Sequence, residues 1–196
     1  MVLVVGLGNP GPEYENTPHN LGFMTIDRLA AESGIAVTRP ERQALVGRGR
    51  LAGREVALAK PMSYMNLSGG PVKAWLEKHE LTAADLLVVY DDFNLPLGSV
   101  RIRERGSAGG HHGMESIIAA LGTNEFTRVR LGAGPDHPLQ DGAEYVLRPF
   151  RRSQQKDLEE FVGRGADAVR SILAEGAAQA MTKFNRRAGG QTNEET

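Results

Sequence analysis

The chain has 196 residues, a formal net charge of −1, and 40% hydrophobic and 24% charged residues, the balance of an ordinary globular domain. Because it contains no cysteine, disulfide bonds, thiolate zinc sites and cysteine nucleophiles are excluded. No apolar run approaches the roughly 20 residues that cross a bilayer, and the start lacks a basic leader and a small-residue cleavage site. We therefore expect a cytoplasmic protein without a membrane segment.

The N-terminal part of the chain predicts, in order, a strand buried on both faces, a proline- and glycine-rich loop, a helix and a hairpin of two strands. These elements fall at residues 2–5, 6–18, 20–34, and 44–51 with 55–60. The hairpin turn is expected at Ala52–Gly53, where a small residue and a glycine follow an alternating segment.

The remainder predicts a helix capped by Ser68, a buried strand, an alternating edge strand, a glycine-rich loop before a helix, a further strand, and an amphipathic helix followed by a short one. The first six of these fall at residues 68–76, 86–90, 99–103, 106–110 with 113–121, 127–132 and 158–173. Strands that alternate with helices predict an α/β fold: a single domain with a mixed, mostly parallel central sheet flanked by helices. We expect this domain to span residues 1–187 and a polar, disordered tail to span 188–196.

The segment Gly6–Gly11 matches the dinucleotide-binding pattern G-x-G-x-x-G directly after a strand. That site needs a helix whose N-terminal amides hold a pyrophosphate, but Pro10 and Pro12 lack two of those amides and Pro18 disfavours a helix in between. We therefore expect the glycines to turn the chain, so that Asn9 projects at the carboxyl end of the first strand.

Six phrases occur in order along the chain. They are GLGNPGPEY (6–14), HNLGF (19–23), KPMSYMNLSG (60–69), DDFNLPLG (91–98), GGHHG (109–113) and RVRLGAG (128–134). Each is weak alone, but together they closely resemble bacterial-type peptidyl-tRNA hydrolase. The resemblance implies a monomeric enzyme, without a cofactor or obligate protein partner, that hydrolyses the ester between the peptide and the 3′ end of tRNA in prematurely released peptidyl-tRNA and so recycles the tRNA.

The resemblance also implies roles for single residues. The histidine of the HN motif, His19, would be the catalytic base that activates water, and Asp91 would orient it. The asparagines of GNPG and MNLSG, Asn9 and Asn66, would bind the peptide and the 3′ end. Further substrate contacts are implied for Tyr14, Tyr64, Met65 and His112, and a clamp on the tRNA 5′-phosphate for Arg103 and Arg130.

These residue types suit ester hydrolysis. A neutral imidazole can take a proton from water near pH 7, and a carboxylate on its other ring nitrogen would fix its tautomer. Side-chain amides can donate hydrogen bonds to carbonyl oxygens, and guanidinium groups match phosphate oxygens. We expect no metal, because the adjacent His111 and His112 cannot share one face of a helix or strand and no H-E-x-x-H spacing is present.

Simpler, non-functional interpretations remain for these residues. His19 could be a structural loop residue, Asp91 a turn residue, Asn66 a helix cap, and the two arginines merely solvated. The chain also departs from the family pattern: His112 stands where asparagine is usual, Pro18 where arginine is common, and 92–94 reads Asp-Phe-Asn instead of acidic-Leu-Asp.

Two other functions compete with the hydrolase. An RNA-binding protein can share this fold without activity, as a chloroplast splicing factor does. A general esterase or peptidase is disfavoured, because the chain has neither G-x-S-x-G nor a cysteine nucleophile.

Overall fold

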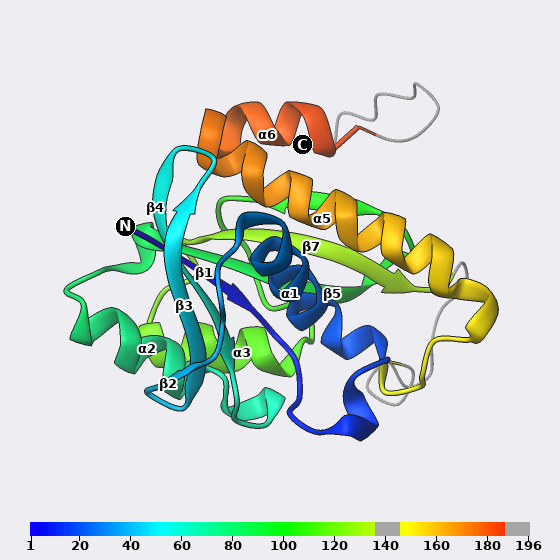
Figure 1. The fold of residues 1–196 in the computed structure, drawn as a ribbon, viewed down its shortest axis with the longest axis horizontal. Helices are drawn as coiled ribbons and strands as arrows, with labels where there is room; N and C mark the ends of the chain where they lie inside the picture. The colour runs from blue at the N-terminus through cyan, green and yellow to red at the C-terminus, as the bar shows by residue number, and fades with distance from the viewer. Residues whose placement is uncertain (136–145, 187–196) are drawn as a thin grey trace.

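The computed structural model describes residues 1–135 and 146–186, so the predicted tail at 188–196 lies outside the described residues. One mixed sheet of seven strands runs through the molecule in the order β2-β3-β4-β1-β5-β7-β6 (Figure 1). The strands are β1 Val2–Gly6, β2 Arg39–Glu41, β3 Ala44–Leu51, β4 Arg54–Pro61, β5 Leu86–Pro96, β6 Val100–Arg103 and β7 Thr127–Gly134. The central strands β4, β1, β5 and β7 are parallel to one another. On one side β3 pairs antiparallel with β4 and β2 pairs antiparallel with β3, and on the other side β6 pairs antiparallel with β7.

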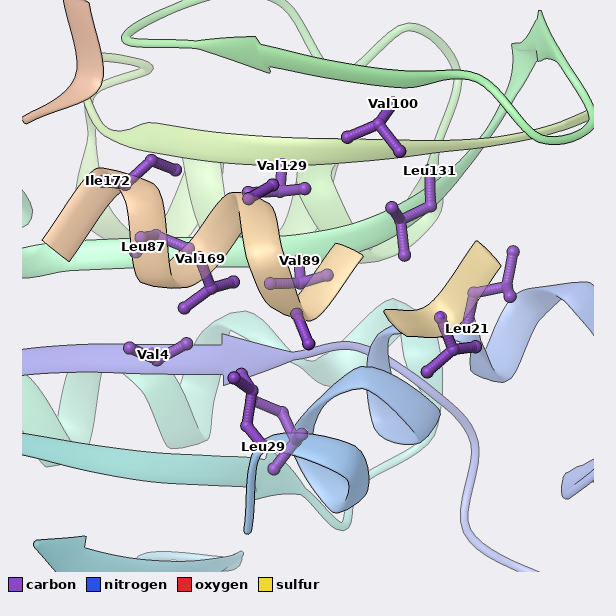
Figure 2. Packing of buried hydrophobic residues seen from close by; sticks show 14 of the residues in the cluster. Val4, Leu21, Leu29, Leu87, Val89, Val100, Val129, Leu131, Val169 and Ile172 are labelled. Carbon is purple, nitrogen blue, oxygen red and sulfur yellow. The ribbon is translucent and has the colours of Figure 1, made fainter. Parts of the chain in front are cut away.

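Helices cover both faces of the sheet. They are α1 Leu21–Ser33, α2 Gly69–Lys78, α3 His112–Leu121, α5 Gln155–Glu175 and α6 Ala177–Phe184. Side chains alternate between the faces along each strand, so Val4 and Val89 pack towards α1 and α5 (Figure 2). Val5 and Val88 pack towards α2 and α3 on the other face. The predicted α/β class with a mixed, mostly parallel sheet is confirmed. None of the helices in the described ranges is long and apolar enough to span a membrane.

Helix α1 begins so close to the sheet that its second residue must be glycine. A Cβ atom on Gly22 would lie 2.4 Å from the backbone nitrogen of Leu7 and 2.5 Å from the carbonyl oxygen of Val89. The Leu7 N–H donates to Val89 O at 3.0 Å, and the Phe23 N–H donates to Leu7 O at 3.2 Å. These contacts hold the segment just before α1 at the carboxyl ends of β1 and β5.

The strand predicted at 86–90 continues to Pro96, which corrects the expectation that the chain leaves the sheet after Tyr90. Asp91 and Asp92 stay in the sheet because they remain paired with Leu131 and Gly132 of β7. Two acidic residues therefore lie inside a buried strand, where each needs a partner for its charge.

Two smaller expectations were wrong or incomplete. The Ser68 side chain does not cap α2, because its hydroxyl donates to the Met65 carbonyl at 2.7 Å instead. The short strand β2 was missed, because its three residues include Pro40 and show no alternating apolar pattern.

Candidate active site

His19 and Asp91 meet at the carboxyl edge of the sheet, although 72 positions separate them in sequence. His19 lies in the 3-10 turn Pro18–Asn20 just before α1, and its Nδ1 is 2.8 Å from Asp91 Oδ2. The His19 side chain is 11% exposed and that of Asp91 is fully buried. A carboxylate only accepts hydrogen bonds, so Nδ1 carries the proton and Nε2 of the neutral ring keeps a free lone pair.

A second histidine, His111, completes this group, although the sequence suggested no catalytic or binding role for it. Its Nε2 is 2.9 Å from Asp91 Oδ1, and its Nδ1 accepts the Met114 N–H at 3.2 Å as the N-cap of α3. Since Nδ1 is an acceptor, Nε2 must carry the proton and donate to Asp91. Each oxygen of this one carboxylate therefore accepts an N–H from a different imidazole.

Asp91 is a carboxylate in this arrangement despite its burial. Burial alone would raise the pKa of Asp91, but the electrostatic attraction of the His19 and His111 rings and the hydrogen bonds from them outweigh it and hold the pKa below its usual range. The two imidazole centroids are 4.9 Å apart, and the Tyr90 ring packs edge-on against His111 at 5.0 Å. The group is thus a packed, hydrogen-bonded unit.

Asn9 is held in one orientation beside this group. The Asn20 side chain accepts the Asn9 N–H at 2.8 Å and donates to the Asn9 carbonyl at 3.0 Å, so it grips the backbone of residue 9 from both sides. Asn9 Oδ1 accepts the Met65 N–H at 2.8 Å, which leaves the Nδ2 donors of Asn9 for another acceptor. Asn9 and Asn20, the latter not singled out from the sequence, together link three of the family phrases through these bonds.

The remaining predicted substrate residues differ in exposure. Met65 is buried in the core between β1 and α3, so its side chain packs against protein atoms. Tyr64, 61% exposed, and Asn66 lie on the surface around it, and Tyr14 is half-buried in the 3-10 turn Pro12–Tyr14. The structure brings Asn9 and Met65 together through a hydrogen bond, but it records no such bond for the side chains of Tyr14, Tyr64 or Asn66 within the described ranges.

His112 points away from the buried group that its neighbour His111 joins. Its side chain is 60% exposed, and its Nδ1 lies 3.3 Å from Glu115 Oε2, one helical turn further along α3. Adjacent residues at a helix start face different directions, so only one of the two histidines can reach Asp91. The signal that could have identified His111 is its place directly before the helix, where an N-cap side chain turns inwards.

The arginines of β6 and β7 share one face of the sheet but have different surroundings. Arg130 pairs with Arg101 across the strands, and its Nε donates to Asp92 Oδ2 at 2.8 Å. Asp92 is therefore a buried ion-pair partner of Arg130. Arg103 is exposed and lies opposite the buried Arg128, so Arg103 and Arg130 are diagonal neighbours.

The buried group has the atom types of a metal site, because nitrogen and oxygen atoms of His19, Asp91 and His111 lie within 4.8 Å of one another. The two nitrogens nearest to Asp91 are, however, at 2.8 and 2.9 Å from its oxygens, which are hydrogen-bond distances. A cation between them would have to displace both bonds, so the donor set fits a hydrogen-bonded base better than a metal centre.

One cavity in the described part of the chain lies away from this group. It has a volume of about 450 Å³ and lies between the β5–β6 turn at Leu97–Gly98 and the first half of α5, with Phe150, Leu158 and Phe161 in its wall. The buried imidazoles and carboxylate, and not this cavity, carry the chemistry needed for hydrolysis.

Comparison with known proteins identifies the family of the chain. The family model described as peptidyl-tRNA hydrolase matches residues 3–193. A protein of Solibacter usitatus named peptidyl-tRNA hydrolase is 54% identical over 195 residues and is covered to 100%, as is this chain. Another so named, from Koribacter versatilis, is 50% identical over 188 residues, with 95% of this chain and 94% of the relative covered.

Solved structures agree as well. The crystal structure of peptidyl-tRNA hydrolase from Acinetobacter baumannii superimposes with a TM-score of 0.86 at 32% identity, covering 94% of each chain. A peptidyl-tRNA hydrolase in complex with N-propanol superimposes with a TM-score of 0.87 at 31% identity, covering 97% of each chain. The chain therefore belongs to the peptidyl-tRNA hydrolase family.

Proposed function

We propose that this protein hydrolyses the ester bond between a peptide and the 3′ end of tRNA in prematurely released peptidyl-tRNA, and so returns the tRNA for reuse. The observation that carries the proposal is the hydrogen bond of 2.8 Å from His19 Nδ1 to the buried Asp91. It leaves Nε2 of His19 as an unprotonated base at the edge where open α/β sheets bind their ligands. Family membership supplies the substrate class.

The reaction needs only water and this base. His19 Nε2 takes a proton from water while the water oxygen bonds to the ester carbonyl carbon, and the carbonyl oxygen gains a negative charge. The carbon–oxygen bond to the tRNA ribose then breaks, and the imidazolium returns its proton to the leaving ribose oxygen. Asp91 stabilises the imidazolium in between, and such positioned base catalysis contributes about 10²–10⁴-fold.

The amides beside the base fit the charge that develops on the substrate. Asn9 Oδ1 is occupied by the Met65 N–H, so the Nδ2 of Asn9 is the atom that can donate to a substrate carbonyl or to the oxyanion. We assign the exposed Tyr64, Asn66 and His112 to contacts with the peptide and the 3′ end, Tyr14 to the terminal nucleotide, and Met65 to the apolar floor beneath the peptide.

Several wider properties belong to the same proposal. We infer that the enzyme acts as a monomer in the cytoplasm, on peptidyl-tRNA, without a cofactor or an obligate protein partner. The support is the chemistry above, in which each step uses a side chain of this chain or water. Size-exclusion chromatography with light scattering at micromolar concentration tests the oligomeric state.

The activity is tested with three substrates: N-acetyl-aminoacyl-tRNA, unblocked aminoacyl-tRNA and a simple alkyl ester. The proposal predicts fast hydrolysis of the blocked tRNA ester and little of the other two. Binding of tRNA without turnover would instead favour an RNA-binding protein on the same fold, and hydrolysis of all three would favour a general esterase.

We assign the tRNA phosphate clamp to Arg103 and Arg130. If Arg103 contacts a phosphate, each ion released on binding makes KM rise with salt, and Arg103→Gln should lower the slope of log KM against log salt by about 0.7–0.9. The measurement is KM at several KCl concentrations, with Arg39→Gln, an exposed arginine on the opposite edge strand β2, as the control. An unchanged slope in Arg103→Gln would remove this residue from the clamp.

A further inference from the structure

The segment that connects β6 to α3 carries His111, but few of its own side chains can fix its conformation. Gly106, Gly109 and Gly110 all have positive φ, at 155°, 58° and 81°. Such glycines let the chain make the sharp path that brings His111 to Asp91, but they have no side chains that could pack. The position of the His111 ring therefore depends on contacts that other residues make with this connection.

Arg128 on β7 supplies two of these contacts. Its Nη1 donates to the carbonyls of Gly106 at 2.8 Å and Ser107 at 3.4 Å. On the other side its Nη2 donates to Asn124 O, and its Nε donates to Phe126 O at 3.3 Å. The guanidinium thus ties the connection before α3 to the segment after α3, and all four acceptors are backbone carbonyls.

A buried arginine is costly, so these bonds must offset a real penalty. Arg128 is 1% exposed, burial lowers the pKa of its guanidinium, and Arg130 nearby adds a like charge. A lysine in its place would offer donors from one point only, whereas the planar guanidinium reaches carbonyls on two sides. An arginine at this position can therefore hold together the segments before and after α3, and we call its hydrogen bonds to their carbonyls the Arg128 strap.

The Arg128 strap is connected to the catalytic group by the few residues between Ser107 and His111. After Ser107, the His111 N–H donates to the Ala108 carbonyl at 3.0 Å, which closes a turn directly before the imidazole. A second anchor is the Asn94 side chain, whose Nδ2 donates to the Gly109 carbonyl at 2.8 Å. Beyond the turn, His111 Nε2 donates to Asp91, the residue that orients His19.

We propose that Arg128 is a positioning residue for hydrolysis, which acts by fixing the connection that carries His111 against Asp91. The inference rests on the proposed function. Arg128 touches neither substrate nor water in this role, and its effect passes through His111. Loss of the strap should lower kcat by about 10–100-fold, the range seen when outer supports of a site are removed, and should change KM by less than about threefold.

The test is a double-mutant cycle of Arg128→Met and His111→Ala, with kcat and KM measured on N-acetyl-aminoacyl-tRNA. If Arg128 acts through His111, Arg128→Met lowers kcat in the otherwise wild-type enzyme but by less than about threefold in His111→Ala. Equal losses in both backgrounds, or an unchanged kcat in the single variant, would overturn the proposal. A purely structural role lowers the folded fraction, which circular dichroism reports, and leaves the kcat of the folded enzyme unchanged.

Two further variants keep the result interpretable. If Arg128→Met does not fold, Arg128→Lys takes its place in the cycle and is expected to show the same pattern with a smaller loss. Arg164→Met is the matched control, because Arg164 on α5 also donates to a carbonyl, that of Gly98, but away from His111. It should retain the wild-type kcat. Absence of hydrolysis by the wild type would refute the proposed function itself, whereas additive losses with an active wild type refute only the role of Arg128.

Discussion

Replacing Asp91 with asparagine is expected to lower kcat on N-acetyl-aminoacyl-tRNA by about 10²–10⁴-fold, although only one atom of the buried side chain changes. The carboxylate accepts an N–H from His19 and another from His111. An asparagine amide has one acceptor and one donor group, so its NH₂ must face a ring N–H. Either the His19 ring moves its proton to Nε2 and loses the base, or the His111 ring changes tautomer and the Met114 N–H loses its acceptor.

The matched control for this variant is Asp92→Asn. Asp92 is the next residue and is also buried, but its carboxylate accepts from Arg130 and from the Asn94 N–H, whereas both imidazoles bond to Asp91. We expect Asp92→Asn to raise KM more than it lowers kcat, because it changes the neighbourhood of the arginine assigned to phosphate. A kcat for Asp91→Asn within threefold of wild type would show that the carboxylate does not orient the base.

The second large effect is expected for His19→Ala. Removing the imidazole removes the only atom assigned to take the proton of water, so kcat should fall by about 10²–10⁴-fold or more. KM should change little, because Arg103, Arg130 and Asn9 still bind the substrate. Single-turnover hydrolysis with excess enzyme, compared with Kd for the blocked tRNA from filter binding, separates the two quantities.

His112, the exposed neighbour of the buried His111, provides the comparison variant for His19→Ala. His112→Asn restores the residue usual in the family and should keep or raise kcat/KM, since His112 has no bond to the buried group. A collapse of kcat/KM in His112→Asn would show that this histidine itself takes part. Activity of His19→Ala above about a tenth of wild type would show that another group activates the water.

Much of the fold follows from local pattern. Apolar runs such as Val2–Val5 and Leu86–Tyr90 are strands because a run buried on both faces needs no alternation, and the glycine at 34 ends α1 where it was expected. The pairing of His19 with Asp91 was expected from the family phrases, and the sheet explains it. Asp91 lies on β5, which is parallel to β1, and His19 lies in the 3-10 turn before α1, which the bonds of Leu7 hold against these two strands.

Other parts of the site depend on distances that local pattern does not contain. Which of His111 and His112 turns inwards is set by where α3 begins, and this differs by one residue from the expected helix start at Gly113. Which of the arginines 128 and 130 is buried depends on loops that cover one of them, because both point to the same face of β7. The grip of Asn20 on Asn9 likewise exists only once α1 has packed against Leu7.

The proton positions on the two buried imidazoles decide whether Nε2 of His19 can act as the base for water. Two-bond ¹H–¹⁵N correlation spectra of the histidine rings near neutral pH distinguish a protonated ring nitrogen from one with a lone pair. We predict that His19 has its proton on Nδ1 and a lone pair on Nε2, and that His111 has the opposite tautomer. A His19 ring protonated on Nε2 in its neutral form would leave no base for water and would contradict the mechanism.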